Sequence, residues 1–303
     1  MSIATIGLIP LVMKPAPFRY VAARSVEQAL ALKAEHGDEA RFLAGGQSLV
    51  PAMNFRLTQP AVLIDINPLN ELAGVRNGGE RVRIGALTRY RALERDPMVQ
   101  VKLPLVAEAL PVIAHPQIRN RGTIGGNLAH ADPASEMPAI VLTLGGRLRA
   151  QSARGERWIE AHDFFVGALT TALESDEMLT EVELPVAPAD GGACFLEMSR
   201  RRGDFAIIGV AASVRLDGQA QCVEARIGLC NAGDGPVFAQ AASRSLAGKV
   251  ISERAIAEAV ALLQGAIDPA GSIHGSKDYQ RHIAGVLTAR ALAIANERAR
   301  RGR

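Results

Sequence analysis

Two Gly-Gly pairs flanked by small polar residues constrain this chain more than any other feature of its sequence. The first lies in AGGQS, residues 44–48, and the second in TIGGNLAHADPASE, residues 123–136. Glycine lets the backbone turn with positive φ and lets a ligand approach bare main-chain N–H groups, which is what binding of a diphosphate requires. We therefore expect two glycine turns that hold one dinucleotide from two sides.

Neither pair belongs to one of the common phosphate-binding motifs. The sequence contains no G-x-x-x-x-G-K-[ST], so a nucleotide with a transferable γ-phosphate is a poor fit. No G-x-G-x-x-G follows a predicted strand, which disfavours binding of NAD or FAD by a Rossmann fold. A tight turn without a ligand is the better interpretation of either pair taken alone.

Composition and charge narrow the class of protein. The 303 residues are 48% hydrophobic and 4% aromatic, with a formal net charge of +3. We expect a soluble, cytoplasmic, globular protein with two or three cores. Nucleic-acid binding is not expected, because no basic stripe is interleaved with stacking aromatic residues. A membrane span is not expected either, because no apolar stretch reaches about eighteen residues.

The three cysteines, Cys194, Cys222 and Cys230, lie in apolar surroundings and show no C-x-x-C spacing. We expect buried, reduced thiols, with no metal and no iron–sulfur cluster bound by this chain. No convincing catalytic triad is present, so we assign no catalytic residue. Asp132, in the second glycine motif, is expected to fix its loop by accepting hydrogen bonds from main-chain N–H groups.

A turn-forming linker, residues 187–192, divides the chain. It separates residues 14–187 from a C-terminal α+β domain at residues 193–303, in which strands are grouped together and helices follow on one face. Residues 1–13 contain an apolar run but no basic leader and no small-residue cleavage site. We interpret them as a loose extension and not as a signal peptide.

The part before the linker divides again near residue 70. Residues 14–70 predict a small βαβ-type unit whose helix follows a capping box at Ser25 and Gln28. Residues 71–187 predict a second α/β unit, with a helix beginning near Thr88 and a buried helix over residues 133–144. The predicted strands of the whole chain cover residues 18–23, 41–44, 62–66, 81–86, 147–152, 156–161, 179–185, 193–201, 205–216 and 222–233.

Three longer motifs carry a resemblance to a known family. GGQSLVPAMNFRL begins at Gly45, QIRNRGTIGGNLAHADPASEMPA at Gln117, and RRRGDFA at Arg200. In order and spacing they resemble the medium, FAD-binding subunit of the molybdenum hydroxylases, the group of carbon monoxide dehydrogenase and xanthine dehydrogenase. The resemblance extends from about Phe18 to Arg290.

The resemblance implies an α+β protein with an FAD-binding domain of the vanillyl-alcohol-oxidase type. This domain would comprise the two α/β subdomains within residues 14–187, followed by a smaller C-terminal domain of antiparallel strands and helices. The glycine segments would wrap the FAD diphosphate, Glu136 would contact the cofactor, and Leu179 would pack against the isoalloxazine. The implied FAD-binding residues are Leu43, Ala44, Gly45, Gly46, Gln47, Ser48, Leu49, Thr123, Ile124, Gly125, Gly126, Asn127, Glu136 and Leu179.

The resemblance also implies a function and partners. The chain would be the flavoprotein subunit of an oxidoreductase, passing electrons from [2Fe-2S] clusters on a small partner subunit through FAD to an external acceptor. The molybdenum cofactor would belong to a large partner subunit, and the assembly would be a dimer of heterotrimers, a heterohexamer. A flavin brings its own redox chemistry, which agrees with the lack of a catalytic triad.

Two other functions stay open at this point. A stand-alone FAD-dependent reductase of the same fold, such as one acting on UDP-sugar precursors of the cell wall, would turn over its substrate with NADPH alone. A non-redox nucleotide-binding module would use the glycine turns for a ligand such as ADP. The two long motifs at residues 117–139 and 200–206 favour the molybdenum hydroxylase subunit.

Overall fold

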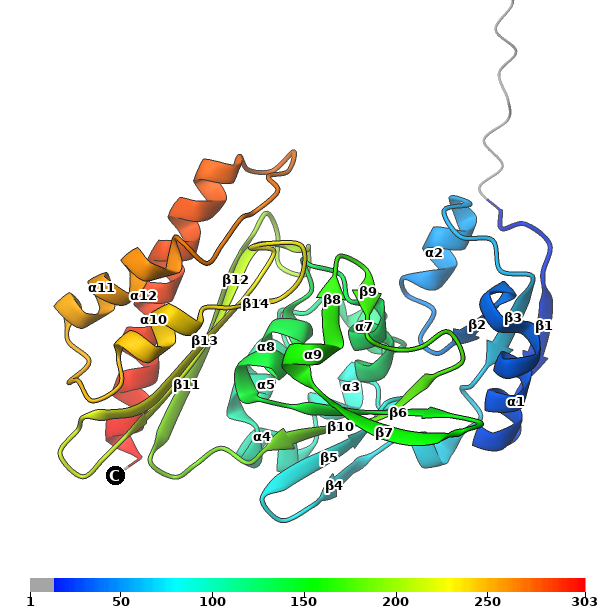
Figure 1. Ribbon diagram of the computed structural model, residues 1–303, viewed down its shortest axis with the longest axis horizontal. Coiled ribbons are helices and arrows are strands. Elements are labelled where there is room, and N and C mark those ends of the chain that lie inside the picture. The colour runs from blue at the N-terminus through cyan, green and yellow to red at the C-terminus, as the bar shows by residue number, and fades with distance from the viewer. Residues whose placement is uncertain (1–13, 303) are drawn as a thin grey trace, which may run out of the picture.

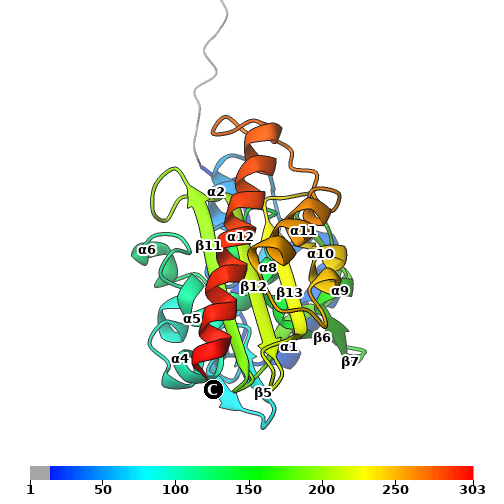
Figure 2. The same cartoon turned by 90° about the vertical axis from the view of Figure 1, so that its left-hand side faces the viewer.

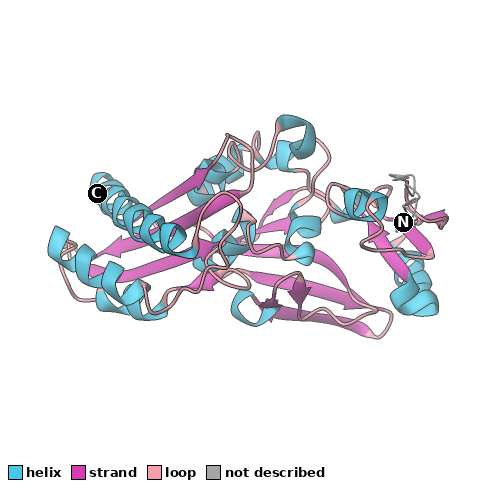
Figure 3. Ribbon diagram, turned by 90° about the horizontal axis from the view of Figure 1, so that it is seen from above, coloured by secondary structure: helices cyan, strands magenta, loops and turns pink. Residues whose placement is uncertain are grey.

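The computed structural model describes residues 14–302, so the expected extension at residues 1–13 lies outside the described residues. Three larger sheets follow one another along the long axis of the molecule (Figures 1 and 3), each with its own apolar cluster. In the described part of the chain, no helix is both long and apolar enough to cross a bilayer.

The first sheet is the predicted βαβ-type unit. Its strand order is β1-β3-β2, and both pairings are parallel. Ser25 Oγ accepts a hydrogen bond from Gln28 N at 3.2 Å, so the predicted cap begins the first helix as expected. The elements are β1 (Arg19–Ala22), α1 (Val26–His36), η1 (Gly37–Glu39), β2 (Ala40–Leu43), α2 (Leu49–Asn54), β3 (Val62–Asp65) and η2 (Asn70–Leu72).

The second sheet is antiparallel, in the order β4-β5-β10-β6-β7, and helices cover one of its faces (Figure 1). The helix expected near Thr88 begins at Tyr90. Thr88 belongs to the preceding turn, where its hydroxyl donates a hydrogen bond to Gly85 O at 2.7 Å. The strands are β4 (Val75–Asn77), β5 (Arg81–Gly85), β6 (Arg147–Ser152), β7 (Gly155–Glu160) and β10 (Met178–Pro185), with the pair β8 (Phe165–Gly167) and β9 (Thr170–Thr171) beside them. The helices are α3 (Tyr90–Leu93), α4 (Pro97–Lys102), α5 (Pro104–Ala109), α6 (Pro116–Arg119), α7 (Ile124–His130), α8 (Glu136–Leu144) and α9 (Ala161–Phe164).

Strand β10 places two glutamates on the face of this sheet opposite the helices. Polar and apolar residues alternate along this strand, which is typical of a strand with one face in solvent. Glu181 and Glu183 are nevertheless only 3% and 1% exposed. Arginines on β4 and β6 cover them: Arg76 Nη2 lies 2.7 Å from Glu181 Oε2, and Arg147 Nε lies 2.6 Å from Glu183 Oε2. The carboxylates are therefore buried as ion pairs beneath half-exposed guanidinium groups.

The third sheet is antiparallel, in the order β11-β12-β13-β14, and includes a short fourth strand that the sequence did not predict. Figure 2 shows α12 lying across one face, and α8 of the middle unit packs on the other. The three cysteines are buried free thiols, as expected. The elements are β11 (Gly191–Ser199), β12 (Ala206–Leu216), β13 (Cys222–Cys230), β14 (Val237–Phe238), α10 (Gln240–Ser245), α11 (Glu253–Leu263) and α12 (Lys277–Arg301).

An ion pair fastens the end of α12 to the middle unit. Arg298 Nη1 and Nη2 lie 2.7 Å and 3.0 Å from the two carboxylate oxygens of Glu108 on α5. Glu108 Oε2 also accepts a hydrogen bond from Phe195 N on β11 at 3.2 Å. The Glu108 carboxylate thus joins α5, α12 and β11. The two parallel hydrogen bonds from the Arg298 guanidinium make this contact both stronger and more specific in its geometry than a single bond would.

We expect Arg298→Ala to lower the free energy of unfolding by about 1–2 kcal/mol, because it leaves Glu108 without its bidentate partner while solvent still screens the site. Urea unfolding measures this change. The matched control is Arg300→Ala on the same helix, since Arg300 is exposed and forms no ion pair with the described residues. Equal effects of the two variants would contradict a specific role for the pair.

Candidate functional site

The first Gly-Gly segment packs directly against Arg121 and Gly122, which immediately precede the second segment and are distant from the first in sequence. A Cβ atom on Gly45 would lie 2.5 Å from Arg121 O and 2.8 Å from Gly122 Cα, so only glycine permits this approach. The first segment leads from β2 into α2, and the second begins α7. The structure therefore brings the two sequence-predicted segments together at the junction of the first and second units.

A polar network that the sequence analysis missed spans this junction. Asn67 Nδ2 donates to Ala44 O at 2.9 Å and to Leu43 O at 3.2 Å. The Arg89 guanidinium donates both to Asn67 Oδ1 and to Arg121 O. Asn67 and Arg89 thus link the start of the first segment to Arg121, just before the second segment. The one sequence feature that could have indicated this network is the position of Asn67 just beyond the end of strand β3.

Residues 45–49 present a run of free main-chain donors. Among the residues that the structure describes, no acceptor faces the N–H groups from Gly45 to Leu49. Gly46 has φ of 71°, the left-handed conformation that glycine adopts without strain. Gln47 and Ser48 are exposed, Gly46 and Leu49 are half-buried and Gly45 is buried, so Gln47 and Ser48 are the most open of these residues to a ligand. Successive free N–H groups in such a turn form a concave site for an anion.

The prediction of a glycine turn is wrong for the second segment, which forms the start of a helix. Gly125 and Gly126 lie inside α7 without positive φ, and Thr123 is the N-cap of that helix. Their N–H groups are already used: Gly125 N donates to Ala86 O at 2.9 Å and Gly126 N to Thr123 Oγ1 at 3.1 Å. Asn127 N donates to Thr123 O at 3.1 Å. The Ala86 carbonyl, the Thr123 hydroxyl and the Thr123 carbonyl thus occupy the three donors that we expected to be bare.

Close packing explains the glycines of the second segment. A Cβ on Gly125 would lie 2.4 Å from Ala86 Cβ, and a Cβ on Gly126 would lie 2.7 Å from Thr123 Oγ1. Gly126 is exposed and Gly125 is buried. Gly125 therefore sets α7 against the second sheet, while Gly126 leaves an open surface next to the first segment.

The loop between α7 and α8 continues this surface. Asp132 Oδ1 accepts from Ala134 N at 2.9 Å, which confirms the predicted role of Asp132 in fixing the loop. Asn127 Nδ2 donates to Ser135 Oγ at 2.6 Å, while Asn127 Oδ1 is buried without a partner among the described residues. An unpaired buried acceptor is costly, so this atom is available to a donor on a ligand or water.

Glu136 begins α8 and is only 4% exposed. Burial raises its pKa from 4.5 to about 8; the hydrogen bond from its own main-chain N–H opposes this shift, and the nearby Glu197 and Asp132 charges add to it. Glu136 is therefore largely protonated at neutral pH and can donate as well as accept a hydrogen bond.

Leu179 lies on β10 and is 6% exposed. The adjacent Thr180 O accepts a hydrogen bond from Ala86 N at 3.0 Å, and Ala86 O in turn accepts the bond from Gly125 N. Leu179 is thus an apolar wall residue close to the second glycine segment.

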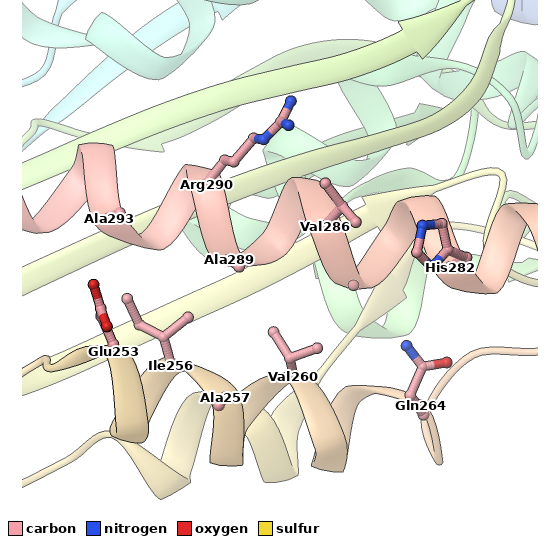
Figure 4. A pocket seen from close by; sticks show the side chains of 11 residues that line it. Glu253, Ile256, Ala257, Val260, Gln264, His282, Val286, Ala289, Arg290 and Ala293 are labelled. Atoms are coloured by element: carbon pink, nitrogen blue, oxygen red, sulfur yellow. The ribbon is translucent and has the colours of Figure 1, made fainter.

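A separate apolar groove lies between α11 and α12 (Figure 4), with a volume of about 630 Å³. Ile256 and Val260 on α11 face Val286 on α12 across it. The groove lies at the end of the molecule formed by the third sheet and its helices, opposite the first sheet (Figure 1), and shares no residue with the glycine segments. It is therefore not part of the candidate site.

Comparison with known proteins gives matches over most of the chain. Residues 16–187 match the family model described as the FAD binding domain in molybdopterin dehydrogenase, and residues 193–295 match the CO dehydrogenase flavoprotein C-terminal domain. The chain is 45% identical to the 6-hydroxypseudooxynicotine dehydrogenase complex subunit alpha of Paenarthrobacter nicotinovorans, over 95% of this chain and 97% of that protein.

Two further matches agree. The carbon monoxide dehydrogenase medium chain of Afipia carboxidovorans is 38% identical, over 95% of this chain and 100% of that protein. A solved structure of carbon monoxide dehydrogenase from Hydrogenophaga pseudoflava superposes with a TM-score of 0.92 at 39% identity, covering 94% of this chain and 99% of that chain.

The buried Glu136 makes stability depend on pH. Its pKa in the folded protein, about 8, exceeds the ordinary value of 4.5. Between pH 4.5 and pH 8 the folded protein therefore keeps a proton on Glu136 that the unfolded protein has lost. Its contribution to stability is therefore lost as the pH rises from about 4.5 to about 8. We expect Glu136→Gln, which cannot ionise, to be more stable than the wild type by about 2–4 kcal/mol at pH 9 and to differ little at pH 5.

Chemical denaturation across this pH range measures the difference. Glu71→Gln is the matched control, because Glu71 is exposed and forms no ion pair within residues 14–302. A parallel pH profile for wild type and Glu136→Gln would contradict the assignment of a raised pKa to Glu136.

Proposed function

Because the chain belongs to the FAD-binding medium subunits of the molybdenum hydroxylases, we propose that it carries electrons from [2Fe-2S] clusters on a partner subunit through FAD to an external acceptor. Relatives of this chain are named for substrates as different as caffeine and carbon monoxide. Such variety among medium subunits supports an electron-carrying role, with the choice of oxidised substrate made by another subunit.

The observation that carries the proposed cofactor site is the run of free main-chain donors from Gly45 to Leu49, set against the start of α7. We assign the FAD diphosphate to residues 43–49 and 123–127, and the isoalloxazine to the region of Leu179. Neutral N–H dipoles can hold a diphosphate without an opposing lysine or arginine. Glu136, buried nearby, is assigned a cofactor contact.

Each part of the chain has a defined task in this arrangement. The free N–H groups of residues 45–49 donate to the diphosphate, and Asn67 with Arg89 keeps the two segments in register. Gly126 leaves space for the ligand beside the Thr123 cap. The apolar side chain of Leu179 excludes water from one side of the isoalloxazine. When bound, FAD supplies the redox chemistry, so the protein need only position it and set its electrostatic surroundings.

The proposed domain division follows the same assignment. Residues 14–187 would form the FAD-binding domain, with subdomains at 14–70 and 71–187, and residues 193–303 the C-terminal domain. The proposed partners are an iron–sulfur small subunit and a molybdenum-binding large subunit, assembled as a dimer of heterotrimers. Purification of a tagged chain from its native cells, with iron and molybdenum assays on the mixture, tests this composition.

We expect the purified chain to be yellow and to release FAD on denaturation, with a flavin absorbance band that a low-potential donor bleaches. Absorbance spectra and chromatography of the released nucleotide measure this. A chain that binds ADP but shows no bleachable band would support the non-redox module instead. Turnover of a substrate with NADPH by the chain alone would support a stand-alone reductase.

Gly126→Val tests the placement of the diphosphate. We expect at least a tenfold loss of FAD affinity, because the branched side chain would displace the Thr123 hydroxyl and fill the space beside residues 44–48. Crowding is the cause, since Gly126 has a helical backbone. The control is Gly218→Val, because a Cβ on Gly218 meets nothing within 4 Å. An unchanged flavin content in Gly126→Val would show that the diphosphate lies elsewhere.

A further inference from the structure

A cavity of about 420 Å³ lies at the junction of the middle unit and the third sheet, and it shares no residue with the glycine segments. The middle unit contributes the start of β5, the residues where α4 meets α5, and the end of α8. The third sheet contributes β12 and β13, and the linker after β10 completes the wall. A cavity of this volume is large enough for a small organic molecule.

Cationic side chains outnumber carboxylates around this cavity. Glu224 Oε1 lies 3.6 Å from Arg226 Nη1, and Glu224 Oε2 lies 3.9 Å from Arg215 Nη1. Asp190, next to the cavity, lies 3.4 Å from Arg215. The four cations therefore exceed these two carboxylates by two positive charges. The cations on the wall are Arg81, Lys102, Arg215 and Arg226.

Two of these arginines meet at Gly145, where α8 ends. Arg81 Nη1 lies 3.5 Å from Gly145 O, and the half-buried Arg81 forms no ion pair with the described residues. Arg226 Nη2 donates to Leu142 O at 3.3 Å, and Arg226 Nε donates to Thr143 O. A Cβ on Gly145 would lie 3.3 Å from Arg226 Nη2. The end of α8 thus holds both guanidinium groups at the cavity.

Apolar side chains form another part of the wall. Leu103 and Leu105 come from the middle unit and Val214 from β12, and each of the three is 1% exposed. A plain inorganic anion would leave this apolar surface facing water. Guanidinium groups beside an apolar wall therefore favour a ligand that has both an acidic group and an apolar body.

We propose that this cavity binds a small organic anion with an apolar body. Its phosphate or carboxylate group accepts hydrogen bonds from Arg81 and Arg226, since planar guanidinium groups bind both kinds of acid through paired donors. Its apolar body packs against the buried leucine and valine side chains of the wall. Because the wall comes from two units, the bound anion joins them and stabilises their contact.

Binding of naphthyl phosphate and of naphthoate to the full chain tests the site. The titrations contain saturating FAD, so that the proposed nucleotide site is filled. Calorimetry should show one molecule of anion bound per chain, with an affinity that falls as salt is added. Neutral naphthol should bind at least about tenfold more weakly. The order of the two anion affinities tells whether the site selects an organic phosphate or a carboxylate.

Two substitutions at the cavity should change the affinity in opposite directions. Arg81→Ala removes a donor that has no carboxylate partner in the described chain, so we expect about tenfold weaker binding. Glu224→Gln removes a charge that competes for Arg226, so we expect about threefold tighter binding. Arg254→Ala is the control, because Arg254 lies on α11 outside the cavity and should leave the affinity unchanged.

The outcomes separate this inference from the proposed function. Failure of both anions to bind would overturn the anion site, and so would equally tight binding of naphthol, which would indicate an apolar gap alone. Equal affinities of the wild type and Arg81→Ala would also overturn it. A chain that binds no FAD would overturn the proposed function only, because the substitutions at the cavity lie outside the residues assigned to the cofactor.

Discussion

The contact between the main chain at Gly45 and the main chain at Arg121 and Gly122 determines the rest of the site. Main chains approach this closely only where a side chain is missing, and here the missing side chain is that of Gly45. The contact joins a parallel sheet to an antiparallel one. It also brings the free donors of residues 45–49 close to the start of α7.

Much of this arrangement could be predicted from residues. The βαβ-type first unit follows from the Ser25 cap and the predicted strands on either side of the helix, and the strand-rich C-terminal part follows from the three predicted strands at residues 193–201, 205–216 and 222–233. Both glycine segments were found from their own residues, and the family likeness added Glu136 to the expected site. Asp132 was predicted from its Asx-turn chemistry, which is local and therefore readable from sequence.

The remainder depends on contacts that a single sequence does not reveal. Gly125 and Gly126 look like turn residues, but their surroundings place them in a helix, because the Thr123 cap and the Ala86 carbonyl satisfy their donors. Glu181 and Glu183 look like solvent-facing strand residues, and only arginines from neighbouring strands bury them. The Arg89–Asn67 bridge likewise joins residues that are distant in sequence.

The junction spanned by Asn67 and Arg89 has a consequence for how the protein matures. A nucleotide that binds on both sides of this junction would stabilise it by mass action, in proportion to the logarithm of the free ligand concentration. Resistance of the N-terminal unit to detachment and to cellular proteases would then depend on the supply of flavin. Cofactor loading would act as a checkpoint that decides which newly made chains survive long enough to join an assembly.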